Sequence, residues 1–176
     1  MIVSFSLENW MSFSEPANFT MVASREKQHG GRVPKVAKYP IRILPIAAVY
    51  GGNASGKTNF FQALSFIKKF VVRGTSPDNL IPVEPYRLDK KSLKEPSRFK
   101  LELLIEDSIY EFSFAVTRKT VIEERLVEIT RTKEKILYDR RGDAPNFDNS
   151  LNKDKRLRFA FGGFFVVRNR LIFRLN

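Results

Sequence analysis

The chain has 176 residues, of which 43% are apolar and 28% charged, and its formal net charge is +12. These proportions are typical of a folded globular domain and exclude a collagen, a coiled-coil rod or a disordered tail. Cysteine is absent and His29 is the single histidine, so a disulfide framework, a zinc site and a well-placed Ser-His-Asp triad are excluded. No run approaches the ~20 apolar residues of a membrane span, and the first residues lack a signal-peptide pattern. We therefore expect a cytoplasmic protein without a membrane partner.

The first elements are expected to be strands. Residues 3–7 alternate apolar and polar side chains, and a second alternating run at 19–23 completes a hairpin. Residues 24–40 are polar and interrupted by glycine and proline, which predicts a loop containing His29. The stretch from Ile41 to Tyr50 is nearly all apolar without alternation, so we expect a central strand buried on both faces.

A helix and an antiparallel sheet should follow. Apolar residues recur at helical spacing from Phe60 to Val71, and the helix should end near Gly74. Residues 75–97 hold four prolines and predict an irregular connector. The alternation then returns to a period of two, which predicts a meander of about four strands over residues 99–139, with its first turn at Asp107-Ser108. Residues 140–156 are polar and loop-like.

One motif carries chemistry. Gly51 to Thr58 (GGNASGKT) fits G-x-x-x-x-G-K-[ST], the Walker A phosphate-binding loop. Its glycines allow the backbone to approach an anion, and the loop amides together with the helix N-terminus attract negative charge. Lys57 would supply a point charge for the β- and γ-phosphates. The hydroxyl of Thr58 would hold Mg²⁺, which prefers oxygen ligands.

A second motif is weaker. Leu103 to Asp107 (LLIED) has the form of a Walker B strand, whose terminal carboxylates hold Mg²⁺ and orient water. Its apolar residues alternate with polar ones and Asp107 lies where the chain must turn, so we interpret it as a hairpin. No other apolar run ends in Asp-Glu and no Leu-Ser-Gly-Gly-like signature follows, so no catalytic residue is identified. Hydrolysis of a nucleotide needs groups that place Mg²⁺ and orient the attacking water.

The order of elements resembles the N-terminal lobe of ABC-type ATPases of the SMC and OLD kind, and four segments resemble more closely the AAA-domain ATP-binding proteins of phage-defence and restriction-linked operons. They are the opening LENWMSF at 7–13, the loop YGGNASGKTN at 50–59, PYRL at 85–88 and EPSRF at 95–99. The resemblance implies an α/β fold, with a P-loop strand and helix beside the meander, in an N-terminal lobe spanning residues 1–155. The residues implied to bind Mg-ATP are Gly51, Gly52, Asn53, Ala54, Ser55, Gly56, Lys57, Thr58 and Asn59, with Thr58 on the metal.

The resemblance also implies partners and shows two departures. Family members are expected to form ATP-dependent head-to-head homodimers that drive a nuclease or effector, with Walker B and signature elements in a second lobe. Met11 stands where a basic residue often helps to hold nucleotide, which puts that contact in doubt. Residues 156–176 form an atypical basic tail, which we interpret as a truncated or frameshifted gene end, a C-terminal strand or a functional basic segment.

Three functions remain open. The first is ATP binding by one part of an ATPase, which alone would bind without turnover. The second is a non-enzymatic nucleic-acid binder, although half of the excess positive charge lies after Asp154. The third is an inactive remnant, whose predicted central strand would lack parallel neighbours and expose apolar surface.

Overall fold

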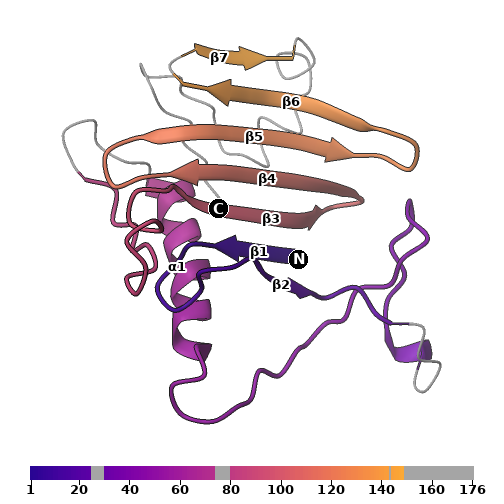
Figure 1. Cartoon of the computed structure of the whole chain (residues 1–176). Coiled ribbons are helices and arrows are strands. Elements are labelled where there is room, and N and C mark those ends of the chain that lie inside the picture. Colours follow the sequence, from indigo (N-terminus) through magenta and orange to yellow (C-terminus); the bar gives the residue numbers. More distant parts are fainter. Residues whose placement is uncertain (25–29, 74–79, 143, 149–176) are drawn as a thin grey trace.

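The computed structural model describes residues 1–24, 30–73, 80–142 and 144–148. Within these ranges seven strands form one sheet in the order β2-β1-β3-β4-β5-β6-β7, and every neighbouring pair is antiparallel. One long helix, α1, crosses a face of this sheet (Figure 1). The described part is thus a single helix on an antiparallel sheet.

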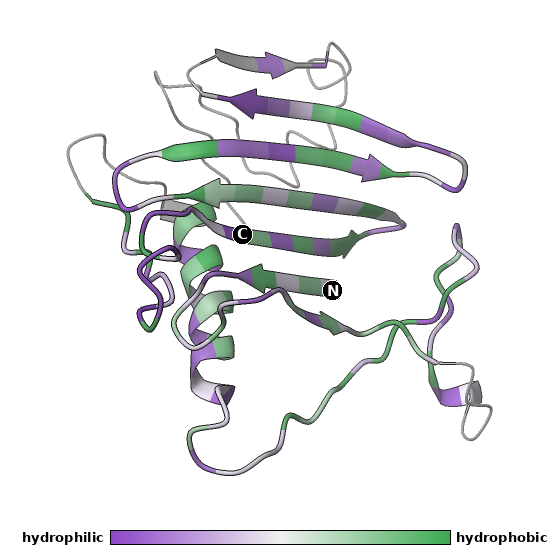
Figure 2. Ribbon diagram, viewed as in Figure 1, coloured by the Kyte–Doolittle hydropathy of each residue, from purple (hydrophilic) through white to green (hydrophobic). Residues whose placement is uncertain are grey.

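The strands follow the alternation of the sequence. Their bounds are β1 Ile2–Glu8, β2 Ala17–Thr20, β3 Ser97–Ile105, β4 Ser108–Val116, β5 Val121–Ile129, β6 Glu134–Arg141 and β7 Ala144–Phe147. The predicted N-terminal hairpin and the meander are both confirmed. Hydrophilic and hydrophobic bands follow one another along the meander strands (Figure 2), because one sheet face packs on the core and the other meets water.

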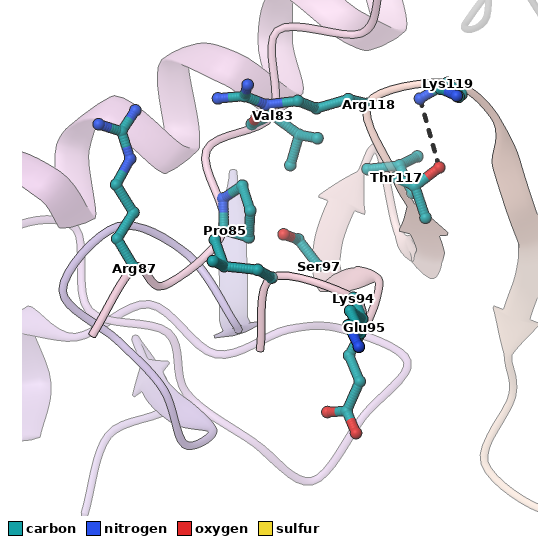
Figure 3. Close-up of a pocket in the computed structure, with 11 residues that line it drawn as sticks. Val83, Pro85, Arg87, Lys94, Glu95, Ser97, Thr117, Arg118 and Lys119 are labelled. Atoms are coloured by element: carbon teal, nitrogen blue, oxygen red, sulfur yellow. Dashed lines mark hydrogen bonds between the residues drawn. The ribbon is translucent and has the colours of Figure 1, made fainter. Parts of the chain in front are cut away.

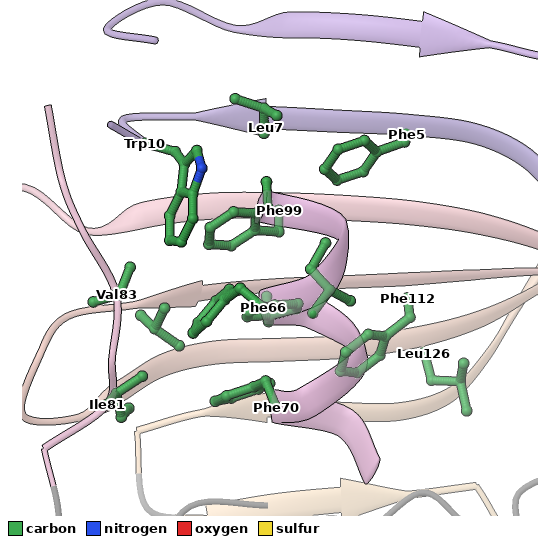
Figure 4. Close-up of a cluster of buried hydrophobic side chains, with 14 of the residues drawn as sticks. Phe5, Leu7, Trp10, Phe66, Phe70, Ile81, Val83, Phe99, Phe112 and Leu126 are labelled. Atoms are coloured by element: carbon green, nitrogen blue, oxygen red, sulfur yellow. The ribbon is translucent and has the colours of Figure 1, made fainter. Parts of the chain in front are cut away.

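The helix α1 (Lys57–Arg73) confirms the predicted amphipathic helix. Its inner face contributes Ala63, Phe66, Ile67 and Phe70 to the main core, where Figure 4 shows the phenyl rings between helix and strands. The ring of Phe66 lies 5.2 Å from those of both Trp10 and Phe99, and Phe70 stacks on Phe114 at 4.7 Å. Such aromatic contacts add to area burial, so this cluster fixes the helix, and the loop before it, on the sheet.

The opposite face of the sheet carries charges in pairs. Lys100 contacts Glu111 at 2.7 Å, and Arg98 pairs with Glu123 across β4. These polar side chains explain the alternation in residues 99–105. The Walker B-like segment therefore lies in the β3–β4 hairpin, as predicted, although its turn residues are Glu106 and Asp107 rather than Asp107-Ser108.

The predicted central strand over Ile41–Tyr50 is wrong. Only isolated bridges join Arg42 to Lys35 and Ile43 to Val22, and no strand forms in residues 44–50. Residues 45–50 are exposed, with Ile46 at 81% and Tyr50 at 93% of full exposure. An apolar run becomes a strand only beside a strand that accepts and donates its hydrogen bonds, and within the described ranges only residues 41–44 of this run have such neighbours.

Two smaller differences concern the loops. Residues 140–156 were expected to be a loop, but β6 extends to Arg141 and β7 adds an edge strand, paired through Tyr138 and Phe147. Within residues 24–40, the described part is a loop with a short 3₁₀ turn at Gly30–Arg32. His29 and the basic tail at 156–176 lie outside the described residues. The division into a lobe at 1–155 and a tail stays a prediction.

Candidate functional site

The predicted phosphate loop lies between the extended residues 44–50 and α1 (Figure 1). Gly51, Gly52, Asn53, Ala54 and Ser55 are exposed, whereas Gly56 and Lys57 are partly buried. The backbone turns sharply here, because Ala54 and Gly56 adopt φ values of +61° and +88°. The loop therefore presents its main chain to solvent, which an anion-binding loop requires.

Lys57 folds back over this loop. Its ammonium Nζ donates to the carbonyl oxygens of Gly51 and Gly52 at 2.8 and 2.6 Å and to the hydroxyl of Ser55 at 3.2 Å. These acceptors are all uncharged, and no carboxylate of the described residues forms an ion pair with this ammonium. The structure thus brings the two ends of the predicted motif together.

The amides at the start of α1 complete the positive site. The first recorded helical bond runs from Phe60 N–H to Gly56 C=O at 2.9 Å, so the N–H groups of Lys57, Thr58 and Asn59 have no intrahelical acceptor. The helix dipole adds partial positive charge at this end. The exposed Thr58 hydroxyl lies on the first turn. These donors fit a polyphosphate chemically, and the Thr58 hydroxyl is a suitable oxygen ligand for Mg²⁺.

The opening segment after β1 packs directly against this loop. The side-chain amide of Asn59 donates to Ser12 Oγ at 2.9 Å, and Trp10 Nε1 donates to the Asn59 carbonyl at 2.8 Å. A Cβ on Gly56 would lie 3.3 Å from both Ser12 Oγ and the Phe13 ring. Motif spacing alone could not reveal this second wall, because its residues are far from the loop in sequence, with 47 positions between Ser12 and Asn59.

Met11 takes no part in the loop. Its backbone N–H donates to the Glu84 carbonyl at 2.7 Å, and its side chain packs against the main core. An apolar side chain in this position gives no charge to a nucleotide, in keeping with the doubt raised by the sequence.

Asn9 organises the connector that follows α1. It is 4% exposed and lies in the left-handed region at φ +52°, a conformation that Asn tolerates better than most residues. Its amide donates to the carbonyls of Ser92 and Glu95 at 2.8 and 3.0 Å, and its side-chain oxygen accepts from Tyr86 N–H at 3.0 Å. This role of Asn9 was not predicted from the sequence. The signal that could have indicated it is an Asn directly after the strand β1.

A separate buried cluster lies on β5 and β6. Tyr138 OH and Arg140 Nη1 both donate to Glu124 Oε2, at 3.0 and 3.3 Å. Burial raises the pKa of Glu124, and Arg140 only partly offsets it. Burial, followed by the nearby Glu124 charge, also raises the pKa of Tyr138. Glu124 and Arg140 therefore form a buried structural ion pair, and the Tyr138 hydroxyl is a further donor to the same carboxylate.

The described ranges lack two kinds of feature, a metal-ligand cluster and a membrane-spanning helix. They contain no group of three or more Asp, Glu or His side chains placed to hold a metal ion. Among the same residues, no helix has both the length and the apolar character needed to span a lipid bilayer.

Comparison with known proteins gives one family. Residues 46–165, more than half of the chain, match the family model described as "AAA domain, putative AbiEii toxin, Type IV TA system". No curated protein matches the chain. The matched range begins before the phosphate loop and runs through α1 and all the meander strands. A domain of this kind implies nucleotide binding related to that of P-loop NTPases.

Proposed function

The chain belongs to this AAA-domain family, and we propose that it binds Mg-ATP through Gly51–Asn59 as part of an ATPase linked to phage defence. The observation that carries the proposal is the position of Lys57, whose ammonium lies inside a glycine-rich loop at the N-terminus of α1. The order of elements, which resembles that of ABC-type ATPases, supports an N-terminal lobe as the finer fold assignment.

Each residue has a defined task in this proposal. Lys57 exchanges its carbonyl acceptors for the β- and γ-phosphate oxygens, where a charge-assisted bond is stronger than a bond to a neutral carbonyl. The free amides of Lys57, Thr58 and Asn59 donate to the phosphates, and the Thr58 hydroxyl holds the metal. Bound Mg²⁺ supplies positive charge that offsets the phosphate oxygens.

The proposal also covers ATP hydrolysis and the partners of the chain. Within the described residues no Walker B-type carboxylate is present to orient water, since the segment at Leu103–Asp107 is a hairpin. We therefore expect binding without hydrolysis by this chain alone. The exposure of residues 51–55 supports a head-to-head homodimer with nucleotide between the two loops, and a nuclease or effector is the expected downstream partner.

The test is Mg-dependent ATP binding measured by calorimetry on the chain and on Lys57→Ala. Loss of the ammonium should weaken binding at least tenfold, and EDTA should weaken it further. Lys68→Ala is the matched control, because Lys68 is an exposed lysine on the same helix with no ion pair among the described residues.

ATP affinity that survives Lys57→Ala would contradict the proposal. A DNA affinity that falls steeply with salt and ignores Lys57 would instead favour a nucleic-acid binder. Undetectable binding of either ligand by a folded chain would favour an inactive remnant.

A further inference from the structure

A cavity of about 580 Å³ lies between the connector after α1 and the turn that joins β4 to β5. Figure 3 shows the basic side chains around it. It shares no lining residue with the phosphate loop. We propose that this cavity binds a small phosphorylated ligand of the nucleotide class, independently of the phosphate loop.

Charge is the first argument. Four basic residues line the cavity, Arg87, Lys94, Arg118 and Lys119, against one lining acid, Glu95. Glu95 pairs with Lys91 at 3.5 Å, outside the cavity lining. The cavity therefore has a clear excess of positive charge.

The ion pairs show which of these charges are available. Glu84 accepts from both Arg87 and Arg118, and the hydrogen bond from Arg87 is the main reason that its pKa is lowered. Lys94 and Lys119 have no ion pair among the described residues. The two free ammonium groups match the charge of a phosphate monoester, which is about −2 at neutral pH.

Shape and surface are the second argument. The floor of the cavity is aliphatic, formed by Val83, Val116 and the half-exposed Leu93. A cavity with an apolar floor and a few polar groups, within the usual ~300–1,000 Å³, is typical of small-molecule sites. The lining has no aromatic side chain, and a single nucleic-acid strand normally needs one for base stacking. A single mononucleotide, whose base and ribose can pack on the aliphatic side chains while its phosphate meets the basic ones, fits better.

The walls are fixed before any ligand binds. Asn9 ties down the connector through Ser92, Glu95 and Tyr86. Arg118 is held by the carbonyl of Val83 at 3.3 Å and by the carboxylate of Glu84 at 3.1 Å. A preformed site avoids the cost of ordering its groups on binding.

A second cavity in the same molecule provides a contrast. It has about 310 Å³ and lies on the polar sheet face. Its charges alternate across the strands, with Arg125 opposite Asp139 and Glu123 opposite Arg141. Four basic and three acidic side chains line it, so its excess of positive charge is smaller than that of the first cavity.

The experiment measures binding of AMP and GMP to the full chain by calorimetry at low salt, in a Lys57→Ala background that disables the phosphate loop. The double variant Lys94→Ala/Lys119→Ala should weaken binding about tenfold or more, since it removes two charge-assisted contacts. The double variant Lys68→Ala/Lys133→Ala removes the same charge from exposed positions elsewhere and should leave affinity unchanged. Pyrophosphate should compete.

Three results would overturn the proposal. The first is the absence of mononucleotide binding at millimolar concentration. The second is an equal loss of affinity in the two double variants. The third is loss of mononucleotide binding when Lys57→Ala alone is introduced. Binding of a DNA duplex that depends on Lys94 and Lys119, without mononucleotide binding, would also refute it and assign the surface to nucleic acid. The proposed ATP site can fail without affecting any of these readings.

Discussion

Asn9 offers the sharpest test of how the two sites are built, because one side chain fixes the connector to the end of β1. Replacing it by Ala removes a long contact to the Pro96 carbonyl at 3.4 Å and three shorter hydrogen bonds, two to the carbonyls of Ser92 and Glu95 and one from Tyr86 N–H, all of 3.0 Å or less. Each of the three shorter bonds is worth about 1 kcal/mol net. Ala in the left-handed region at φ +52° adds about 1 kcal/mol of strain. The lost hydrogen bonds and the backbone strain together should lower the free energy of unfolding by about 4 kcal/mol.

That is a large share of the 5–15 kcal/mol that separates folded from unfolded domains. The assay is urea unfolding followed by fluorescence of Trp10, the single tryptophan, which is buried next to Asn9. Asn9→Gly separates the two causes, since Gly relieves the strain but still loses the bonds, and it should cost about 3 kcal/mol. Asn18→Ala, at an exposed position on β2, should change stability by less than about 0.5 kcal/mol.

A free energy of unfolding for Asn9→Ala within about 1 kcal/mol of that of the unmodified chain would contradict this role of Asn9, because buried unsatisfied groups should cost more. A Gly variant less stable than the Ala variant would also contradict it, since the positive φ should favour Gly.

Three further predictions concern the loop, the buried acid and the unpaired segment. Gly56→Ala places a Cβ 3.3 Å from Ser12 Oγ at φ +88°, so thermal unfolding should show a loss of about 1–2 kcal/mol, whereas Gly31→Ala, with open space around it, should be neutral. Because the folded-state pKa of Glu124 is raised, its contribution is present at low pH and is lost as pH rises through that pKa. Glu124→Gln should therefore gain stability relative to the unmodified chain between acid and neutral pH, and a constant difference in parallel urea titrations would contradict this. Amide hydrogen exchange should be fast in residues 45–50 and slow in β4, and protection of residues 45–50 would contradict the exposed conformation.

Local patterns predicted most of the described fold. The alternation in residues 3–7 and 99–139 gives a hairpin and a meander in which each strand pairs with the next strand along the chain, so a short connection determines these pairings. The pairing of β1 with β3, which joins the hairpin to the meander, is long-range and no local pattern predicts it. The amphipathic spacing from Phe60 to Val71 predicts α1 in the same way. The Asn9 network, the contact of Ser12 with Asn59 and the cavity beside Arg118 join residues far apart in sequence, and no local period encodes them.

The segment Ile41–Tyr50 shows where such patterns stop being sufficient. Its composition predicts burial on both faces, but burial needs neighbouring strands, and β1 is already paired with β2 and β3. The segment follows the β2 side of the sheet through two bonds, Ala23 N–H to Arg42 C=O at 2.9 Å and Leu44 N–H to Met21 C=O at 2.7 Å, and then leaves it. The phosphate loop therefore lacks the rigid strand that the motif implies on its N-terminal side. Its position depends instead on α1 and on the contacts of Trp10 and Ser12 with Asn59, which makes the opening segment the main support of the candidate nucleotide site.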